Sequence, residues 1–145
     1  MRLLLLFSCV LIVGSGLASF AGAEDARQLE GTWAVVSARH NGADSATIKE
    51  HRLVFGRDTF RILKGDTVVY AGTYSIDTSK KPAAIDFTNT EGEAKGKKWL
   101  GIFQLDKGML TICDNGADTA KPRPTELESA SGSGRVLVVF KRVKP

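Results

Sequence analysis

The sequence has 145 residues, with 20 Lys or Arg against 16 Asp or Glu, which gives a net charge of +4. This length suits one domain, and the mixture of apolar and charged residues excludes a collagen, a coiled coil, a polytopic membrane protein and a disordered chain. The surplus of basic residues is small for a nucleic-acid-binding protein, so we expect no nucleic-acid partner.

The beginning of the chain is typical of a signal peptide. Arg2 supplies a positive charge, residues 3–13 are apolar, and Ala21-Gly22-Ala23 offers the small side chains that a signal peptidase needs. The apolar run is shorter than the roughly 20 residues of a transmembrane helix, so we expect no membrane-spanning segment. We predict cleavage near Ala23, export to the periplasm or the exterior, and a mature domain of residues 24–145.

Cysteine usage agrees with one small exported domain. Cys9 lies in the predicted signal peptide, so the mature chain keeps Cys113 alone and can form no internal disulfide. Residues 6–9 also resemble a lipoprotein box, in which Cys9 would be acylated, but Phe7 and the short apolar run before it favour soluble export. Cys113 ends an apolar segment, which favours a buried structural residue over a reactive thiol.

The mature chain is predicted to fold as short β-strands after one helical turn at residues 25–30. Apolar side chains alternate with polar ones, as at Leu53 and Phe55, and turn residues such as Lys64-Gly65-Asp66 separate the runs. Eight strands with short links form an up-and-down antiparallel sheet, and closure into a β-barrel removes its edges. The predicted strands are Thr32–Arg39, Arg52–Phe55, Thr59–Leu63, Val68–Ile76, Ala84–Thr88, Trp99–Leu105, Met109–Cys113 and Val136–Lys141.

Two predicted loops interrupt this series of strands. Residues 89–98 are rich in Gly, Glu and Lys and are typical of a solvated loop. Residues 114–134 are longer and contain two prolines and a Ser/Gly run, and connections of this length are uncommon in compact domains. This segment either packs across a barrel mouth or forms a mobile surface connection.

Motifs of catalysis and metal binding are absent from the sequence. There is no zinc-protease, thiol-redox, nucleophile-elbow, phosphate-loop or dinucleotide motif. His40 and His51 stand outside any ligand pattern, so we expect both to be solvated. We therefore expect no catalytic residue, no metal and no cofactor, and a binding protein is favoured over an enzyme.

Four aromatic residues lie in the predicted strands, at Tyr70, Tyr74, Trp99 and Phe103. Aromatic residues among lysines can stack on nucleic-acid bases. In a series of strands they are more often part of the core or of a pocket lining, so these four are the candidate ligand-binding residues.

Gly31-Thr32-Trp33 stands at the start of the first predicted strand. This triplet resembles the G-x-W signature of lipocalins, which are eight-stranded barrels. The resemblance implies that Trp33 plugs the closed end of the barrel and that a basic residue, here Arg142, packs over it. Gly31, Trp33 and Arg142 are therefore expected to be structural, as is Cys113.

A second resemblance covers nearly the whole predicted mature chain. It is carried by Leu29-Glu30-Gly31-Thr32-Trp33, Val35-Val36-Ser37, Leu53-Val54-Phe55, Gly72-Thr73-Tyr74, Lys81-Pro82, Ile85-Asp86-Phe87, Gly101-Ile102-Phe103, Leu105-Asp106, Leu110-Thr111-Ile112-Cys113, Arg123-Pro124-Thr125-Glu126 and residues 136–142. These blocks are similar to a family of small exported domains that is expanded in planctomycete bacteria. The resemblance implies no catalytic residues, and Leu127 departs from the aromatic residue expected after Pro-Thr-Glu.

Together these features favour a lipocalin-like barrel that binds a small apolar or amphipathic ligand in its mouth. The alternative is a protein-interaction module, such as an inhibitor of an exported hydrolase, that uses the barrel rim and residues 114–134. The free volume inside the barrel decides between them, because an eight-stranded barrel can be filled by its own side chains.

Overall fold

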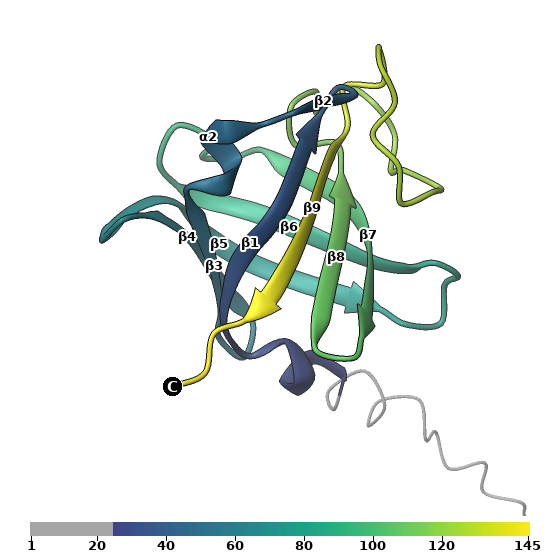
Figure 1. The fold of residues 1–145 in the computed structure, drawn as a ribbon. Coiled ribbons are helices and arrows are strands. Elements are labelled where there is room, and N and C mark those ends of the chain that lie inside the picture. The colour runs from purple at the N-terminus through teal and green to yellow at the C-terminus, as the bar shows by residue number, and fades with distance from the viewer. Residues whose placement is uncertain (1–24) are drawn as a thin grey trace, which may run out of the picture.

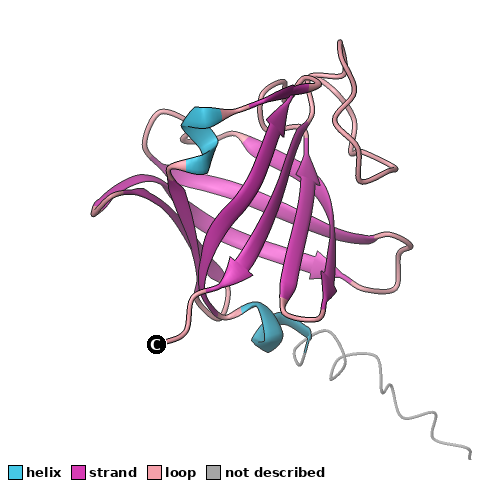
Figure 2. Ribbon diagram, viewed as in Figure 1, coloured by secondary structure: helices cyan, strands magenta, loops and turns pink. Residues whose placement is uncertain are grey.

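The computed structural model describes residues 25–145, which form a closed β-barrel (Figure 1). Eight strands follow one another antiparallel around the barrel, and the last pairs with the first to close it. Figure 2 shows how little of this described part of the chain is helical. The predicted eight-stranded antiparallel barrel is confirmed, whereas the predicted cleavage near Ala23 lies outside the described residues. The barrel strands are β1 (Gly31–His40), β3 (His51–Phe55), β4 (Thr59–Lys64), β5 (Thr67–Asp77), β6 (Ala83–Glu91), β7 (Lys98–Asp106), β8 (Met109–Asp114) and β9 (Val136–Arg142).

Closure depends on β1, which pairs with two neighbours along different parts of its length. Residues 31–34 pair with β3, and residues from Trp33 to His40 pair with β9. The register with β9 shifts between Val35 and Ser37, and such a bulge increases the twist of a strand. Elsewhere in the barrel, β5 and β6 approach each other closely at Gly72. A β-carbon there would lie 1.9 Å from the carbonyl oxygen of Thr88, so the two strands can pair at this point only through glycine.

The connection between β1 and β3 contains two short elements that the sequence did not reveal. These are the two-residue strand β2 (Ala43–Asp44), which pairs with β1, and the helix α2 (Ala46–Lys49). Ser45 caps the helix, because its Oγ accepts a hydrogen bond from the backbone N–H of Ile48 at 3.3 Å. The predicted turn near residue 25 is present as a helix at residues 25–29. No helix among the described residues is long and apolar enough to cross a membrane.

Trp33 fills the end of the barrel nearest the helix of residues 25–29. Its side chain is fully buried, and its Nε1–H donates a hydrogen bond to the carbonyl oxygen of Leu29 at 2.8 Å. The guanidinium of Arg142 lies 4.3 Å from the centre of the indole ring, which is a cation–π contact. The first strand, the last strand and the N-terminal helix are thereby joined at one end.

Gly31 makes room for the guanidinium of Arg142. Nη1 of Arg142 donates to the carbonyl oxygen of Glu30 at 2.6 Å, and Nη2 donates to that of Gln28. A β-carbon at Gly31 would lie 2.9 Å from Nη1, and the backbone has a φ of +123° there. A side chain at this position would therefore strain the backbone and displace the arginine.

Candidate functional site

The other half of the barrel encloses a cavity of about 290 Å³. Figure 1 shows α2 beside this half of the barrel. Its walls are the inward-facing side chains of the strands, with α2 and the residues after β8 at the rim. The lining residues are Val35, His40, Thr47, Ile48, His51, Arg52, Leu53, Ile62, Tyr70, Phe87, Trp99, Ile112, Asp114, Gly116, Ala117, Val136, Val138 and Phe140. Most of them are apolar, so the cavity is a hydrophobic chamber with a few polar groups.

Aromatic rings make up one wall of the cavity. Tyr70 and Trp99 meet edge to face, with their ring centres 5.2 Å apart, and Phe87 lies 6.2 Å from Trp99. The structure thus places two of the four aromatic candidates, Tyr70 and Trp99, in the cavity wall. It does not bring Tyr74 or Phe103 into the lining.

Tyr74 is instead part of the packing at the closed end. Its hydroxyl lies 3.1 Å from the carbonyl oxygen of Gly56 and 3.3 Å from that of Arg57. Burial, reinforced by the nearby charges of Glu30 and Asp58, raises the pKa of Tyr74 to about 12, so the hydroxyl remains a hydrogen-bond donor. Phe103 is buried in the hydrophobic core.

Asp114 is the residue of this cavity that sequence reasoning missed. It continues the inward-facing series of β8, in which Leu110 and Ile112 are buried, and its Oδ1 accepts a hydrogen bond from the N–H of Gly116 at 2.7 Å. Burial raises the pKa of the Asp114 carboxyl to about 6, against the lowering effect of that hydrogen bond. The alternation at residues 110, 112 and 114 was the signal that could have identified it.

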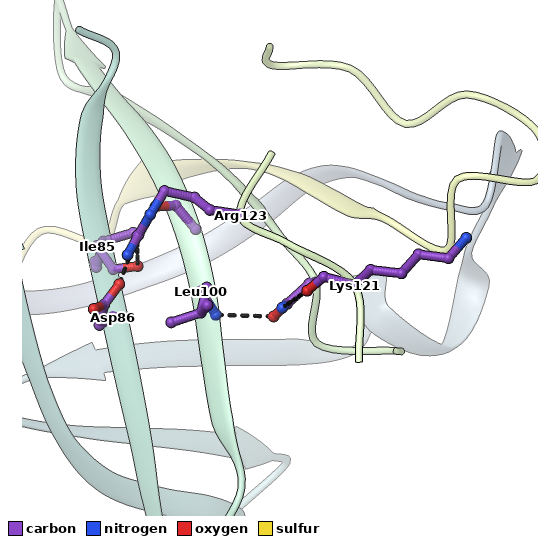
Figure 3. Close-up of polar contacts among 7 residues, drawn as sticks. Ile85, Asp86, Leu100, Lys121 and Arg123 are labelled. Atoms are coloured by element: carbon purple, nitrogen blue, oxygen red, sulfur yellow. Dashed lines mark hydrogen bonds and ion pairs between the residues drawn. The ribbon is translucent and has the colours of Figure 1, made fainter. Parts of the chain in front are cut away.

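Asn115 fixes the backbone that carries Asp114 to the cavity. Its Oδ1 accepts a hydrogen bond from the N–H of Leu100 at 2.8 Å, and its Nδ2 donates to the carbonyl oxygen of Lys121 at 2.6 Å (Figure 3). The side chain is almost fully buried. Asn115 thus joins the end of β8 to β7 on one side and to the following segment on the other.

Arg123 holds that segment against the outside of the barrel. Its Nη1 donates to the carbonyl oxygen of Gly101 at 2.7 Å and lies 2.5 Å from Oδ1 of Asp86. Figure 3 shows the side chain of Arg123 reaching toward Ile85 and Asp86. Asp86 points outward, because its neighbours Ile85 and Phe87 are both in the core. The part of the segment around Arg123 therefore packs on the outer face of β6 and β7, whereas Ser129 and Gly134 contact the turn after β1.

Cys113 lies beneath the same segment. The thiol is fully buried, and its Sγ lies 3.5 Å from the carbonyl oxygen of Glu128. Burial raises its pKa above the ordinary value of a cysteine. Pro124 is also fully buried, so residues 115–135 form an ordered outer layer, of which Gly116 and Ala117 reach the cavity.

The two histidines line the cavity, and the predicted solvated side chain is confirmed for His40 alone. His40 is exposed and His51 half-buried. Burial, followed by the positive charge of Lys64, lowers the pKa of His51, so its imidazole is neutral at pH 7. The guanidinium of Arg52 is directed outward, where it donates to the carbonyl oxygen of Gly65 at 2.9 Å and pairs with Asp66 at 3.8 Å.

Among the described residues, the acidic side chain of the cavity and its two imidazoles are not joined to one another. Within residues 25–145, no hydrogen bond or ion pair joins Asp114 to His40 or His51, and no group of three His, Cys, Asp or Glu side chains could hold a metal ion. Comparisons with family models, curated proteins and solved structures find no match to this chain. The function is therefore inferred from the geometry of the cavity.

Proposed function

We propose that this protein binds a small apolar or amphipathic molecule in the barrel cavity and is exported after cleavage near Ala23. The observation that carries the proposal is an apolar chamber inside a barrel whose other end is filled by Trp33. Ligand sites are typically apolar concavities with a few polar groups that orient the ligand. A volume of about 290 Å³ is at the low end of such sites, so the ligand is small.

The remainder of the molecule supports binding over turnover. The cavity is built from strands and from a segment held by Asn115 and Arg123, so it is formed before a ligand arrives. A preformed site loses little conformational entropy on binding. The resemblance to lipocalins through Gly31-Thr32-Trp33 points in the same direction, and no cofactor or metal is part of the proposal.

Phenethyl alcohol, a neutral amphipathic molecule with one ring, tests the proposal by NMR titration of the purified protein. We expect saturable binding with a dissociation constant of about a millimolar or tighter. Val35→Phe places a ring in the cavity and should abolish binding. Val36→Phe is the matched control, because Val36 is 48% exposed on the opposite face of β1, and it should bind normally. Equal binding by both variants would contradict a site in the cavity.

Export has its own test. The intact mass of the protein recovered from the exported fraction should correspond to a chain that begins at Glu24 without modification. Retention of the first 23 residues, or an acyl group on Cys9, would contradict the proposed processing.

A protein-interaction module, such as an inhibitor of an exported hydrolase, is a second candidate function. The ordered segment of residues 115–135 favours it, because a rigid exposed segment is suited to binding a protein surface. Inhibition of purified exported hydrolases should then be unaffected by Val35→Phe but weakened by Glu126→Lys, since Glu126 is exposed on that segment. Inhibition that depends on Val35 alone would assign the effect to the cavity.

A further inference from the structure

Asp114 gives the cavity a negative charge that the packing of the barrel does not require. Among the described lining residues it is the single acidic one, and its neighbours on the inner face of β8 are Leu110 and Ile112. The barrel interior is built mostly from apolar side chains, and a carboxylate in such surroundings loses hydration. The carboxylate therefore requires a partner that offsets this loss of hydration.

The protein does not supply that partner from its described residues. The ion pairs of residues 25–145 join Arg52 to Asp66, Lys64 to Glu50 and Arg123 to Asp86, and none includes Asp114. The one hydrogen bond to its carboxylate comes from the N–H of Gly116. Arg52, the one lining residue with a permanent positive charge, directs its guanidinium to Gly65 and Asp66 instead.

The carboxylate lies beside the aromatic wall. Gly116 stands between the two groups, because a β-carbon there would be 2.8 Å from Oδ1 of Asp114 and 3.6 Å from the indole ring of Trp99. Tyr70 meets the same indole edge to face. A carboxylate near an aromatic ring can attract an organic cation, through the charge of the carboxylate and through the quadrupole at the face of the ring.

We propose that the cavity selects organic cations, namely a protonated amine or quaternary ammonium group on a small apolar body. The ammonium group lies against Asp114 and Trp99, and the apolar body lies among Ile62, Phe87 and Val138. This inference rests on the proposed function, because it names the class of ligand that the same cavity takes. It predicts discrimination by charge among molecules of equal size and shape.

Three probes that share a phenethyl body compare three charge states. Phenethylamine is a cation at neutral pH, phenethyl alcohol is neutral and hydrocinnamate is an anion. We expect phenethylamine to bind about tenfold to a hundredfold more tightly than the alcohol, as a charge-assisted hydrogen bond predicts, and hydrocinnamate to bind most weakly. NMR titration of the purified protein at neutral pH measures all three dissociation constants.

Two variants assign the selectivity to one carboxylate. Asp114→Asn keeps the shape and the acceptor for the N–H of Gly116, and it should reduce the affinity for phenethylamine to about that of the alcohol. Asp118→Asn removes a nearby charge outside the cavity lining and should change none of the three affinities. A preference for the amine that survives in D114N would overturn the inference.

The outcomes distinguish this inference from the proposed function. Binding of the alcohol at least as tightly as the amine in the unmodified protein overturns selection of cations but leaves the cavity as a ligand site. Binding of none of the three probes overturns both. The three-probe comparison in the unmodified chain decides the inference even if D114N does not fold.

Discussion

The two ends of the barrel use their polar groups in opposite ways. At the closed end, the indole N–H of Trp33 donates to Leu29, and the guanidinium of Arg142 is occupied by two carbonyl oxygens and the indole face. At the open end, the Asp114 carboxylate accepts one backbone hydrogen bond and has no cationic partner among the described residues.

This difference indicates which end stabilises the fold and which end is available for a ligand. Satisfied buried polar groups contribute to stability, whereas a partly buried charge without a partner, such as that of Asp114, lowers it. A residue that lowers stability is expected where function requires it, since proteins commonly trade stability for activity at their sites. Asp114 is such a residue, and Trp33 is its structural counterpart.

The largest predicted effect on stability comes from removal of the Trp33 side chain. Trp33→Ala should lower the free energy of unfolding by about 3–5 kcal/mol, because the fully buried ring, its hydrogen bond and its contact with Arg142 are all removed. Trp99→Ala should cost less, because Trp99 is half-buried in the cavity wall. Chemical denaturation of both variants measures the difference. Equal losses would contradict the division of roles between the two ends.

A smaller effect of opposite sign is predicted for Asp114→Asn. The folded state raises the carboxyl pKa to about 6 from an ordinary value of 3.8, so it binds the proton more tightly than the unfolded chain does. The resulting stabilisation is complete below about pH 4 and is lost as the pH rises through 6. At pH 7, Asp114→Asn should therefore raise the free energy of unfolding by on the order of 2 kcal/mol.

Denaturation of both proteins between pH 4 and pH 7 measures this effect. The unmodified protein should lose stability relative to D114N across that interval. D114N changes no other residue of the cavity lining, so the difference between the two curves reports on Asp114. A constant difference between the two curves would show that Asp114 is not destabilising in its charged form.

The smallest predicted effect concerns Cys113, beneath the segment that positions the open end. Cys113→Ala should cost about 1 kcal/mol, as for other small buried side chains. Because burial raises the pKa of the thiol, its labelling by a thiol reagent at neutral pH should proceed no faster than local or global opening. Rapid labelling of the native protein would show that residues 115–135 leave the thiol accessible.

The barrel could be predicted because its signals are local. Alternation at pairs such as Leu53 and Phe55, and turns such as Lys64-Gly65-Asp66, identify strands and hairpins without knowledge of distant contacts. The helix α2 was missed because four residues are too few to show a helical period, although Ser45 is a typical capping residue.

The site could be predicted only in part, because it is made by residues that are distant in the sequence. Tyr70 and Trp99 were identified by residue type, but the same criterion selected Tyr74 and Phe103, which pack outside the cavity lining. The position of Asp114 depends on a register that continues one step beyond the apolar run of β8 and on the contacts of Asn115. The register can be extrapolated from the alternation at residues 110 and 112, but the contacts of Asn115 are not encoded in a local pattern.

The chain contains two tryptophans, Trp33 at the closed end of the barrel and Trp99 in the cavity wall. Their signals test directly whether a ligand binds at the open end. We would follow the two indole N–H signals in proton–nitrogen correlation spectra while phenethylamine is added. The signal of Trp99 should shift in a saturable manner, and that of Trp33 should remain in place. A shift of the Trp33 signal with no change at Trp99, or no shift of either, would contradict a ligand site at the open end.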